Sequence, residues 1–202
     1  MPSKHGMNRY DEDKLILRLK RGDEEAFNTL FSEYKGMIFS IAYGITLDHE
    51  ESFDIVQEVF IKVYENIPRF QGKSKLSTWL HRITVNHCLN WQRKWKRRFR
   101  WHHHSIDSTD GLDNSALGSE SFSPEAIYRE KEMGRILQES LKKIPEDARA
   151  VFILKEFQGL SYDEIAEVMK IKRGTVSSRL YYVRKKLDKS IKKYMDNDKE
   201  KQ

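Results

Sequence analysis

The chain has 202 residues, a length that suits one or two small domains, and its 37 Lys and Arg residues against 31 Asp and Glu residues give a net charge of +6. Its single cysteine excludes an internal disulfide framework and fits a reducing compartment. No apolar signal core opens the sequence and no run approaches the length of a membrane span, so we expect a soluble, cytoplasmic protein.

The first seventy residues carry apolar side chains at spacings of three and four, which predicts amphipathic helices. Gly22 and Asp23 separate the first helix from the second, as a C-terminal glycine and an N-cap, and Pro68 ends the third. The predicted helices span residues 11–20, 24–44 and 48–67. Because prolines and glycines are few in this charged, periodic sequence, we expect an all-α fold.

The third predicted helix has two different faces. One face is apolar and suits burial, whereas the other carries Asp54, Gln57 and Glu58 around the aliphatic residue Ile61. Two acids and an amide around an aliphatic side chain suit docking to a basic helical partner, but a solvated helix face has the same pattern. From the residues alone, the solvated face is the better interpretation.

Residues 72–100 begin as a polar loop and continue as a long helix rich in rings and cations. Trp91, Trp95 and Phe99 are spaced four apart and therefore share one side of this helix. Residues 82–100 contain seven Lys and Arg residues and no acid. Flat rings interleaved with cations suit nucleic acid, and the alternative is a packed aromatic stripe beneath a solvated basic face.

Residues 101–123 have the composition of a linker, with Ser, Asp, Gly and Asn in place of large apolar residues. Five acids and no Lys or Arg occur between residues 101 and 126. We therefore predict two small helical domains, residues 10–100 and 124–194, joined by a flexible acidic linker over residues 101–123.

The C-terminal part predicts a helix-turn-helix. Ser161 and Glu164 form a capping box in front of a very short helix, and a turn at residues 170–173 leads to a basic helix. Residues 170–194 carry a net charge of +9, which suits phosphate contacts, although an ordinary helical hairpin is the alternative. The predicted helices span residues 124–143, 145–159, 162–169 and 174–194.

The chain lacks a constellation suited to catalysis or metal binding. His81 and Cys88 lie seven residues apart, about 10 Å along a helix, which is too far to share an ion without other ligands. The run His102, His103 and His104 falls in the predicted linker. We expect no metal, no cofactor and no enzymatic activity, because no nucleophile, base and acid set and no phosphate-binding glycine loop is present.

Two motifs in this order carry a family resemblance, D-x-x-Q-E-x-F at residues 54–60 and F-x-G-x-S-x-x-S-T-W-L-x-R-I at residues 70–83. With the helix-turn-helix, the chain resembles bacterial sigma factors of the extracytoplasmic-function (ECF) type over about residues 12–190. The resemblance implies two helical domains, region 2 and region 4, that direct core RNA polymerase to promoters of a stress or envelope regulon. It also implies promoter DNA and an anti-sigma factor, often membrane-anchored, as partners, and no small-molecule substrate.

The resemblance assigns three groups of site residues. Region 2 would grip core polymerase, and a loop at residues 70–77 would capture a base flipped out of the −10 element, whose melted strand exposes bases for stacking. The polymerase-binding residues are Asp54, Gln57, Glu58 and Ile61. The −10 residues are Phe70, Gly72, Lys73, Ser74, Lys75, Ser77, Trp79, Arg82, Asn86, Asn90, Arg93 and Arg97. The −35 residues are Arg173, Thr175, Ser177, Ser178, Arg179, Tyr182, Arg184 and Lys185.

Some features depart from the family pattern or leave a rival open. Many members have Gly and Pro where this chain has Lys170 and Lys172, which puts the geometry of the turn in doubt. Trp79 replaces the aromatic cluster of vegetative sigma factors, which predicts weaker melting and stricter promoter choice, and Trp91 and Trp95 are predicted to serve mainly packing. A stand-alone helix-turn-helix regulator is the alternative, but it explains only the C-terminal half.

Overall fold

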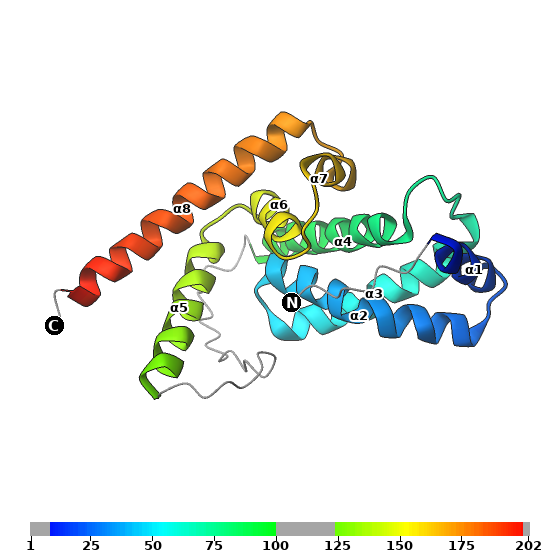
Figure 1. Cartoon of the computed structure of the whole chain (residues 1–202), viewed down its shortest axis with the longest axis horizontal. Coiled ribbons are helices and arrows are strands. Elements are labelled where there is room, and N and C mark those ends of the chain that lie inside the picture. Colours follow the sequence, from blue (N-terminus) through cyan, green and yellow to red (C-terminus); the bar gives the residue numbers. More distant parts are fainter. Residues whose placement is uncertain (1–8, 100–123, 200–202) are drawn as a thin grey trace.

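The computed structural model describes residues 9–99 and 124–199, and within these ranges the chain forms helices and no strand (Figure 1). The predicted all-α fold is confirmed, and the predicted linker lies outside the described residues. The helices are α1 (Arg9–Lys20), α2 (Glu24–Thr46), α3 (His49–Asn66), the 3₁₀ turn η1 (Ile67–Arg69), α4 (Leu76–Phe99), α5 (Pro124–Lys142), α6 (Glu146–Glu156), α7 (Tyr162–Met169) and α8 (Arg173–Lys199).

Short-range capping explains where several helices begin. The Asp23 carboxylate accepts the Ala26 N–H at 3.1 Å, and Ser161 and Glu164 form the predicted capping box. The second helix does not end at Gly44, as predicted, but continues to Thr46 before Leu47 turns into the left-handed region at φ 60°. The last helix likewise begins one residue earlier and ends five residues later than predicted.

Helices α1 to α4 form an N-terminal bundle around the apolar stripes expected from the sequence. The predicted buried face of α3 is confirmed, since Ile55 and Val59 are 1% and 0% exposed. Phe31 of α2 follows the same apolar spacing, but its side chain is 40% exposed. Within the described residues, no helix is both long and apolar enough to span a membrane.

Helices α5 to α8 form a second helical unit, in which α7 and α8 pack against each other. Ile165, Val176 and Leu180 are at most 1% exposed and form a buried apolar wedge between these two helices. Arg149 of α6 is also buried, and its guanidinium donates to the Leu141 carbonyl at 2.9 Å. Burial lowers the pKa of Arg149, because the charged form loses hydration there.

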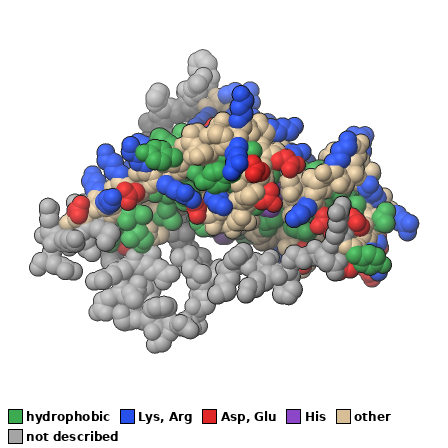
Figure 2. Space-filling view, turned by 45° about the horizontal axis from the view of Figure 1, so that its top comes forward, with side chains coloured by type: hydrophobic (Ala, Val, Ile, Leu, Met, Phe, Trp, Pro, Cys, Tyr) green, Lys and Arg blue, Asp and Glu red, His purple; other side chains and the backbone are tan. Residues whose placement is uncertain are grey.

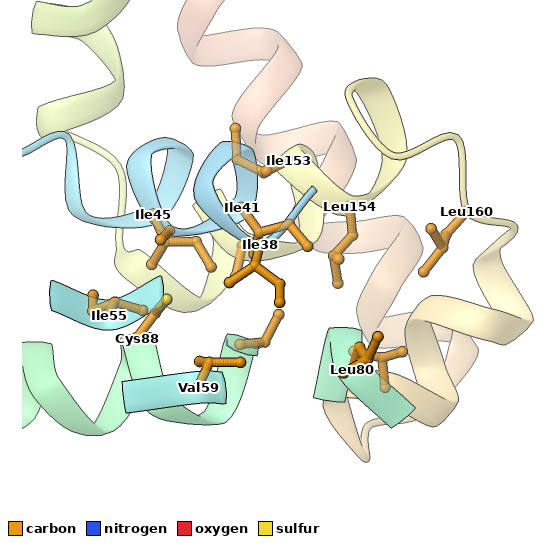
Figure 3. Packing of buried hydrophobic residues seen from close by; sticks show 14 of the residues in the cluster. Ile38, Ile41, Ile45, Ile55, Val59, Leu80, Cys88, Ile153, Leu154 and Leu160 are labelled. Atoms are coloured by element: carbon orange, nitrogen blue, oxygen red, sulfur yellow. The ribbon is translucent and has the colours of Figure 1, made fainter. Parts of the chain in front are cut away.

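The two units pack against each other and share one apolar core. α2 and α4 of the first unit contact α6 and α7 of the second (Figure 1), and Figure 3 shows Ile153 and Leu154 of α6 beside Ile38 and Ile41 of α2. Gly44 permits this approach, since a Cβ at that position would lie only 2.7 Å from Ile153 Cδ1. The sequence predicts two domains on a flexible connection, and this extensive contact between them is a new finding.

Cys88 lies at the centre of the N-terminal bundle, and we predict that its thiol is inert in the folded chain (Figure 3). The side chain is 0% exposed, and burial raises the pKa of the thiol to about 12. At pH 8 only about one thiol in 10⁴ is then the reactive thiolate, even before access is considered. Ellman's reagent should label the native chain at least ~100-fold more slowly than the denatured chain. Equally fast labelling of both would contradict this packing.

Candidate functional site

The polar stripe of α3 faces solvent, as predicted. Asp54, Gln57 and Glu58 are exposed, and Ile61 between them is 53% exposed. Two apolar residues extend this surface, since Phe53 is 52% and Tyr64 is 62% exposed. Sequence reasoning missed this pair, although a separation of eleven residues places both on the same edge of the helix. The result is an acidic surface with apolar contact area beside it.

The loop in front of α4 is supported by the buried Phe70 side chain and by a hydrogen bond from Leu76 to Glu12 of α1. The Phe70 ring is only 6% exposed and lies 4.9 Å from the Trp79 ring, centroid to centroid. Leu76 begins α4 by donating its N–H to the Glu12 carboxylate at 2.6 Å. Phe70 therefore supports the loop from the core in this structure, which differs from its predicted place among DNA-facing residues. Trp79, also predicted to face −10 DNA, is half-buried and packs against the same core.

The tip of this loop remains open to solvent. Gly72 takes the positive φ of 68° that favours glycine, and Lys73 and Lys75 are exposed beside it. Ser74 and Ser77 are half-buried. The structure thus brings cations and hydroxyl groups together at the mouth of the loop.

Four of the residues assigned to −10 DNA, Arg82, Asn86, Asn90 and Arg93, follow one another along the long helix α4 at spacings of three and four. Asn86, Asn90 and Arg93 are exposed, and Arg93 Nη1 donates to Asn90 Oδ1 at 3.0 Å. Arg97 continues the same row and donates to the Arg93 carbonyl at 3.4 Å. Arg82 stands apart, because its guanidinium Nη2 contacts the Glu167 carboxylate of α7 at 3.1 Å. Three of the four predicted side chains are therefore accessible.

A basic hollow of about 600 Å³ lies between α3 and the last turns of α4. Lys62 Nζ donates to His87 Nδ1 at 2.6 Å, and burial and the Lys62 charge lower the pKa of His87. Sequence reasoning missed Lys62 and His87, which come together only through the packing of two helices. The lining residues are Lys62, His87, Asn90, Trp91, Arg93, Lys94, Lys96 and Arg97.

The sequence predicts that both indoles at this end of α4 serve mainly packing, but only one of them is partly buried. Trp91 and Trp95 stack on each other with ring centroids 6.5 Å apart, and Trp91 is half-buried. Trp95 is 47% exposed, because the helix extends beyond the bundle there. An exposed ring beside Arg and Lys side chains is available for contact with a base or a sugar.

The predicted helix-turn-helix consists of α7, an unusual turn at residues 170–172, and α8. Lys170 takes the left-handed conformation, φ 54°, and its N–H donates to the Ala166 carbonyl, so lysine occupies a position that favours glycine. The α8 side chains Ser177, Ser178, Tyr182 and Lys185 are exposed, whereas Thr175 is half-buried.

Several predicted −35 cations form ion pairs within the C-terminal unit. Arg184 Nη2 lies 2.6 Å from Glu156 Oε1, and Arg173 Nε lies 3.6 Å from Asp163 Oδ1. Arg179 pairs with Asp147 of α6 and is only 24% exposed. Figure 2 shows Lys and Arg side chains spread over one face of the molecule with Asp and Glu side chains between them. Arg173 and Arg184 remain largely exposed beside their partners, whereas Arg179 is mostly covered.

Comparison with known families matches both helical units. Residues 30–98 match Sigma-70 region 2, and residues 134–187 match Sigma-70 region 4. The RNA polymerase sigma-H factor of Pseudomonas aeruginosa is 32% identical over 180 residues, 89% of this chain and 93% of that relative. The ECF RNA polymerase sigma-E factor of Escherichia coli K12 is 32% identical over 177 residues, 88% of this chain and 92% of that relative.

Solved structures share the fold at lower sequence identity. The sigma factor RpoE of Bartonella quintana, in complex with the anti-sigma factor NepR, aligns with a TM-score of 0.66 and 21% identity over 82% of this chain and 96% of that one. CnrH, in complex with the cytosolic domain of CnrY, aligns with a TM-score of 0.62 and 19% identity over 90% of this chain and 97% of that one.

Proposed function

The chain belongs to the ECF sigma factors of the sigma-70 family, which direct core RNA polymerase to promoters, and on this premise we propose how its surfaces divide that work. Residues 10–100 act as region 2 and residues 124–194 as region 4, joined through the segment at 101–123. The finer assignments, that the chain has no enzymatic activity, works in the cytoplasm and serves a stress or envelope regulon, belong to the same proposal.

We propose that the α3 stripe binds core polymerase. Asp54, Gln57, Glu58 and Ile61 form a continuous exposed row, and the exposed rings of Phe53 and Tyr64 widen it. Acids around apolar side chains suit a partner that presents cations around an aliphatic centre. This row is the observation that carries the function, because a regulator acting alone has no need of a second, acidic docking face.

Two other surfaces are assigned to DNA. The loop at residues 72–75 with the first turn of α4, and the exposed row Asn86, Asn90, Arg93 and Arg97, suit the −10 element, with the basic hollow behind them holding phosphates. The N-terminal part of α8, with Ser177, Ser178, Arg179 and Tyr182, suits base edges in the major groove of the −35 element. An anti-sigma factor is proposed as the inhibitory partner, since the structural relatives named above are complexes with such proteins or with a comparable cytosolic domain.

Transcription with purified components tests this function. The chain is mixed with core polymerase and sheared genomic DNA of its source bacterium, and the transcripts are sequenced. We expect transcripts whose start sites share two upstream sequence elements at a constant spacing. A stand-alone regulator would bind DNA without polymerase and yield no transcript above the level of core enzyme alone, and that result would reject the proposal.

A further inference from the structure

Inside the basic hollow, a lysine and a histidine from different helices are in direct contact. Lys62 Nζ of α3 lies 2.6 Å from His87 Nδ1 of α4, and both side chains are half-buried. An ammonium group has only hydrogen-bond donors, so it occupies the lone pair of Nδ1 and leaves the ring proton on Nε2. In the free chain, His87 is therefore a neutral imidazole beside a permanent cation.

The charged groups that face His87 are mostly cations. Burial lowers the pKa of His87, and the charges of Lys62 and Lys94 lower it further, whereas Glu58 on the same helix as Lys62 acts in the opposite direction. Among the described residues, the charged groups around the hollow are Lys62, Arg93, Lys94, Lys96 and Arg97, with Glu146 of α6 paired to Lys96. Cations outnumber carboxylates here, which favours an anionic ligand.

The lining of the hollow suits a phosphate together with its sugar. Its cations and the Asn90 amide offer donors to phosphate oxygens, and the half-buried Trp91 ring offers an apolar wall. A volume of about 600 Å³ is larger than one phosphate requires and leaves space for the attached sugar. Asn90, Arg93 and Arg97 belong both to the hollow and to the exposed row assigned to DNA. A DNA strand that lies on this row therefore places its backbone at the hollow.

We propose that Lys62 and His87 hold one phosphate of the melted −10 strand, and that this phosphate binds together with one proton, which His87 takes up. The proposal rests on the assignment of α4 to −10 DNA given above. It goes beyond that assignment, because it recruits Lys62 from the helix assigned to polymerase and makes the DNA contact of this chain sensitive to pH. Neither residue belongs to the set that the sequence predicts for −10 DNA.

The arriving phosphate changes the hydrogen bonding of the pair. A phosphate oxygen accepts the hydrogen bond of Lys62 in place of His87 Nδ1, and its negative charge favours the imidazolium form of the ring. Nδ1 then takes up one proton from water, and the ring donates from both nitrogens. Two adjacent cations from two helices therefore contact one phosphate, whereas in the free chain one of them is neutral.

The direction of the pH effect follows from the protonation of His87 with and without DNA. The bound phosphate raises the pKa of His87 from the lowered value of the free chain. Above the pKa of the complex the ring is neutral in both states, and below the pKa of the free chain it is charged in both. Between these two pKa values DNA binding takes up a proton, so affinity rises as the pH falls, by at most about ten-fold per pH unit.

Neutralising single phosphates tests the contact in the complete holoenzyme. Promoter fragments found in the transcription assay above are synthesised with one uncharged methylphosphonate at a time in the −10 strand. We expect one position at which this change weakens binding of the unsubstituted chain by at least ~5-fold and that of Lys62→Met by less than ~2-fold. Lys20→Met is the matched control, since Lys20 is an exposed α1 residue that does not line the hollow.

The control variant should respond to every methylphosphonate as the unsubstituted chain does. Each chain is assayed at a core polymerase concentration that saturates it, so that weaker polymerase binding does not imitate weaker DNA binding. If Lys62→Met and Lys20→Met respond alike at every position, Lys62 holds no phosphate and the proposal is wrong.

The pH dependence of the same complex tests the uptake of the proton. Between pH 8 and pH 6, we expect the unsubstituted chain to gain at least ~5-fold more promoter affinity than His87→Gln, whose amide does not titrate. The methylphosphonate at the position identified above should remove this gain from the unsubstituted chain, and that measurement is independent of how well His87→Gln folds. Equal pH dependence of the unsubstituted chain on the normal and the methylphosphonate fragments would overturn the proposal.

Transcription from the unmodified promoter at pH 8 is measured in parallel. If the unsubstituted chain yields no specific transcript, the proposed sigma function itself is wrong. If it transcribes normally and no phosphate responds to Lys62→Met, the function stands and only the phosphate contact is wrong.

Discussion

Replacing Glu58 with lysine is expected to weaken binding to core RNA polymerase by at least ten-fold, which corresponds to about 1.4 kcal/mol. Glu58 is exposed at the centre of the α3 stripe, between Asp54 and Ile61. The substitution replaces a carboxylate with a cation in front of a basic partner surface, so that attraction becomes repulsion and a paired charge loses its partner. Fluorescence anisotropy of the labelled chain, titrated with core polymerase, measures the effect.

Glu33→Lys provides the matched control, because Glu33 is an exposed acid on α2 that lies outside the stripe. Both substitutions change the net charge by +2, and both residues are solvent-exposed, so the free energy of unfolding should change little in either variant. Only Glu58→Lys should lose polymerase affinity. If the two variants bind polymerase equally well, the docking surface lies elsewhere on the chain.

Local features of this fold can be predicted from the sequence. The Asp23 cap and the Ser161 capping box involve residues three apart in the chain, so no tertiary information is required to find them. The two faces of α3 follow from the helical period in the same way, because the period places Val59 on the buried face and its sequence neighbour Glu58 on the exposed face.

The contacts between the two units could not be predicted from the sequence. Periodicity predicts that Ile153 and Leu154 are buried, but it does not say against which helix, and a bundle of α5 to α8 alone would satisfy the same pattern. The partners of Arg82 and Arg179 are 85 and 32 residues away in the chain. Such pairs depend on the packing of whole helices, and for this reason the sequence assigns both arginines to DNA without showing what holds them.

In the turn of the helix-turn-helix, the sequence indicated a difficulty that the structure resolves. The absence of glycine at Lys170 made the turn doubtful, yet the lysine adopts the left-handed conformation and caps α7. This conformation costs a residue with a Cβ about 1–2 kcal/mol, which the buried wedge beneath it offsets. The departure from the family pattern therefore changes local strain and charge and leaves the crossing of α7 and α8 intact.

Arg179→Ala is expected to lower affinity for the chain's own promoter by roughly 1–3 kcal/mol, or about 5- to 150-fold, if the side chain contacts a base. Arg179 lies in the second turn of α8, beside the exposed Ser178 and Tyr182, where a recognition helix faces base edges. In the chain without DNA, its guanidinium forms an ion pair with Asp147 of α6. Binding of the full holoenzyme to promoter fragments with single substitutions in the −35 element measures the loss and its sequence dependence.

Substitution of Asp147 distinguishes a base contact of Arg179 from a purely structural role of this residue. If Arg179 serves only to attach α8 to α6, Asp147→Ala removes the same ion pair and should weaken promoter binding as much as Arg179→Ala does. If Arg179 contacts a base, Asp147→Ala should leave promoter affinity within about two-fold, because the Asp147 side chain is 47% exposed and an ion pair with such a residue contributes only ~0–1 kcal/mol to stability. A phosphate contact gives a third pattern, in which Arg179→Ala weakens all DNA sequences evenly and reduces the salt dependence of binding. Relaxed discrimination at one −35 position, seen with Arg179→Ala and not with Asp147→Ala, is the result that assigns the residue to sequence reading.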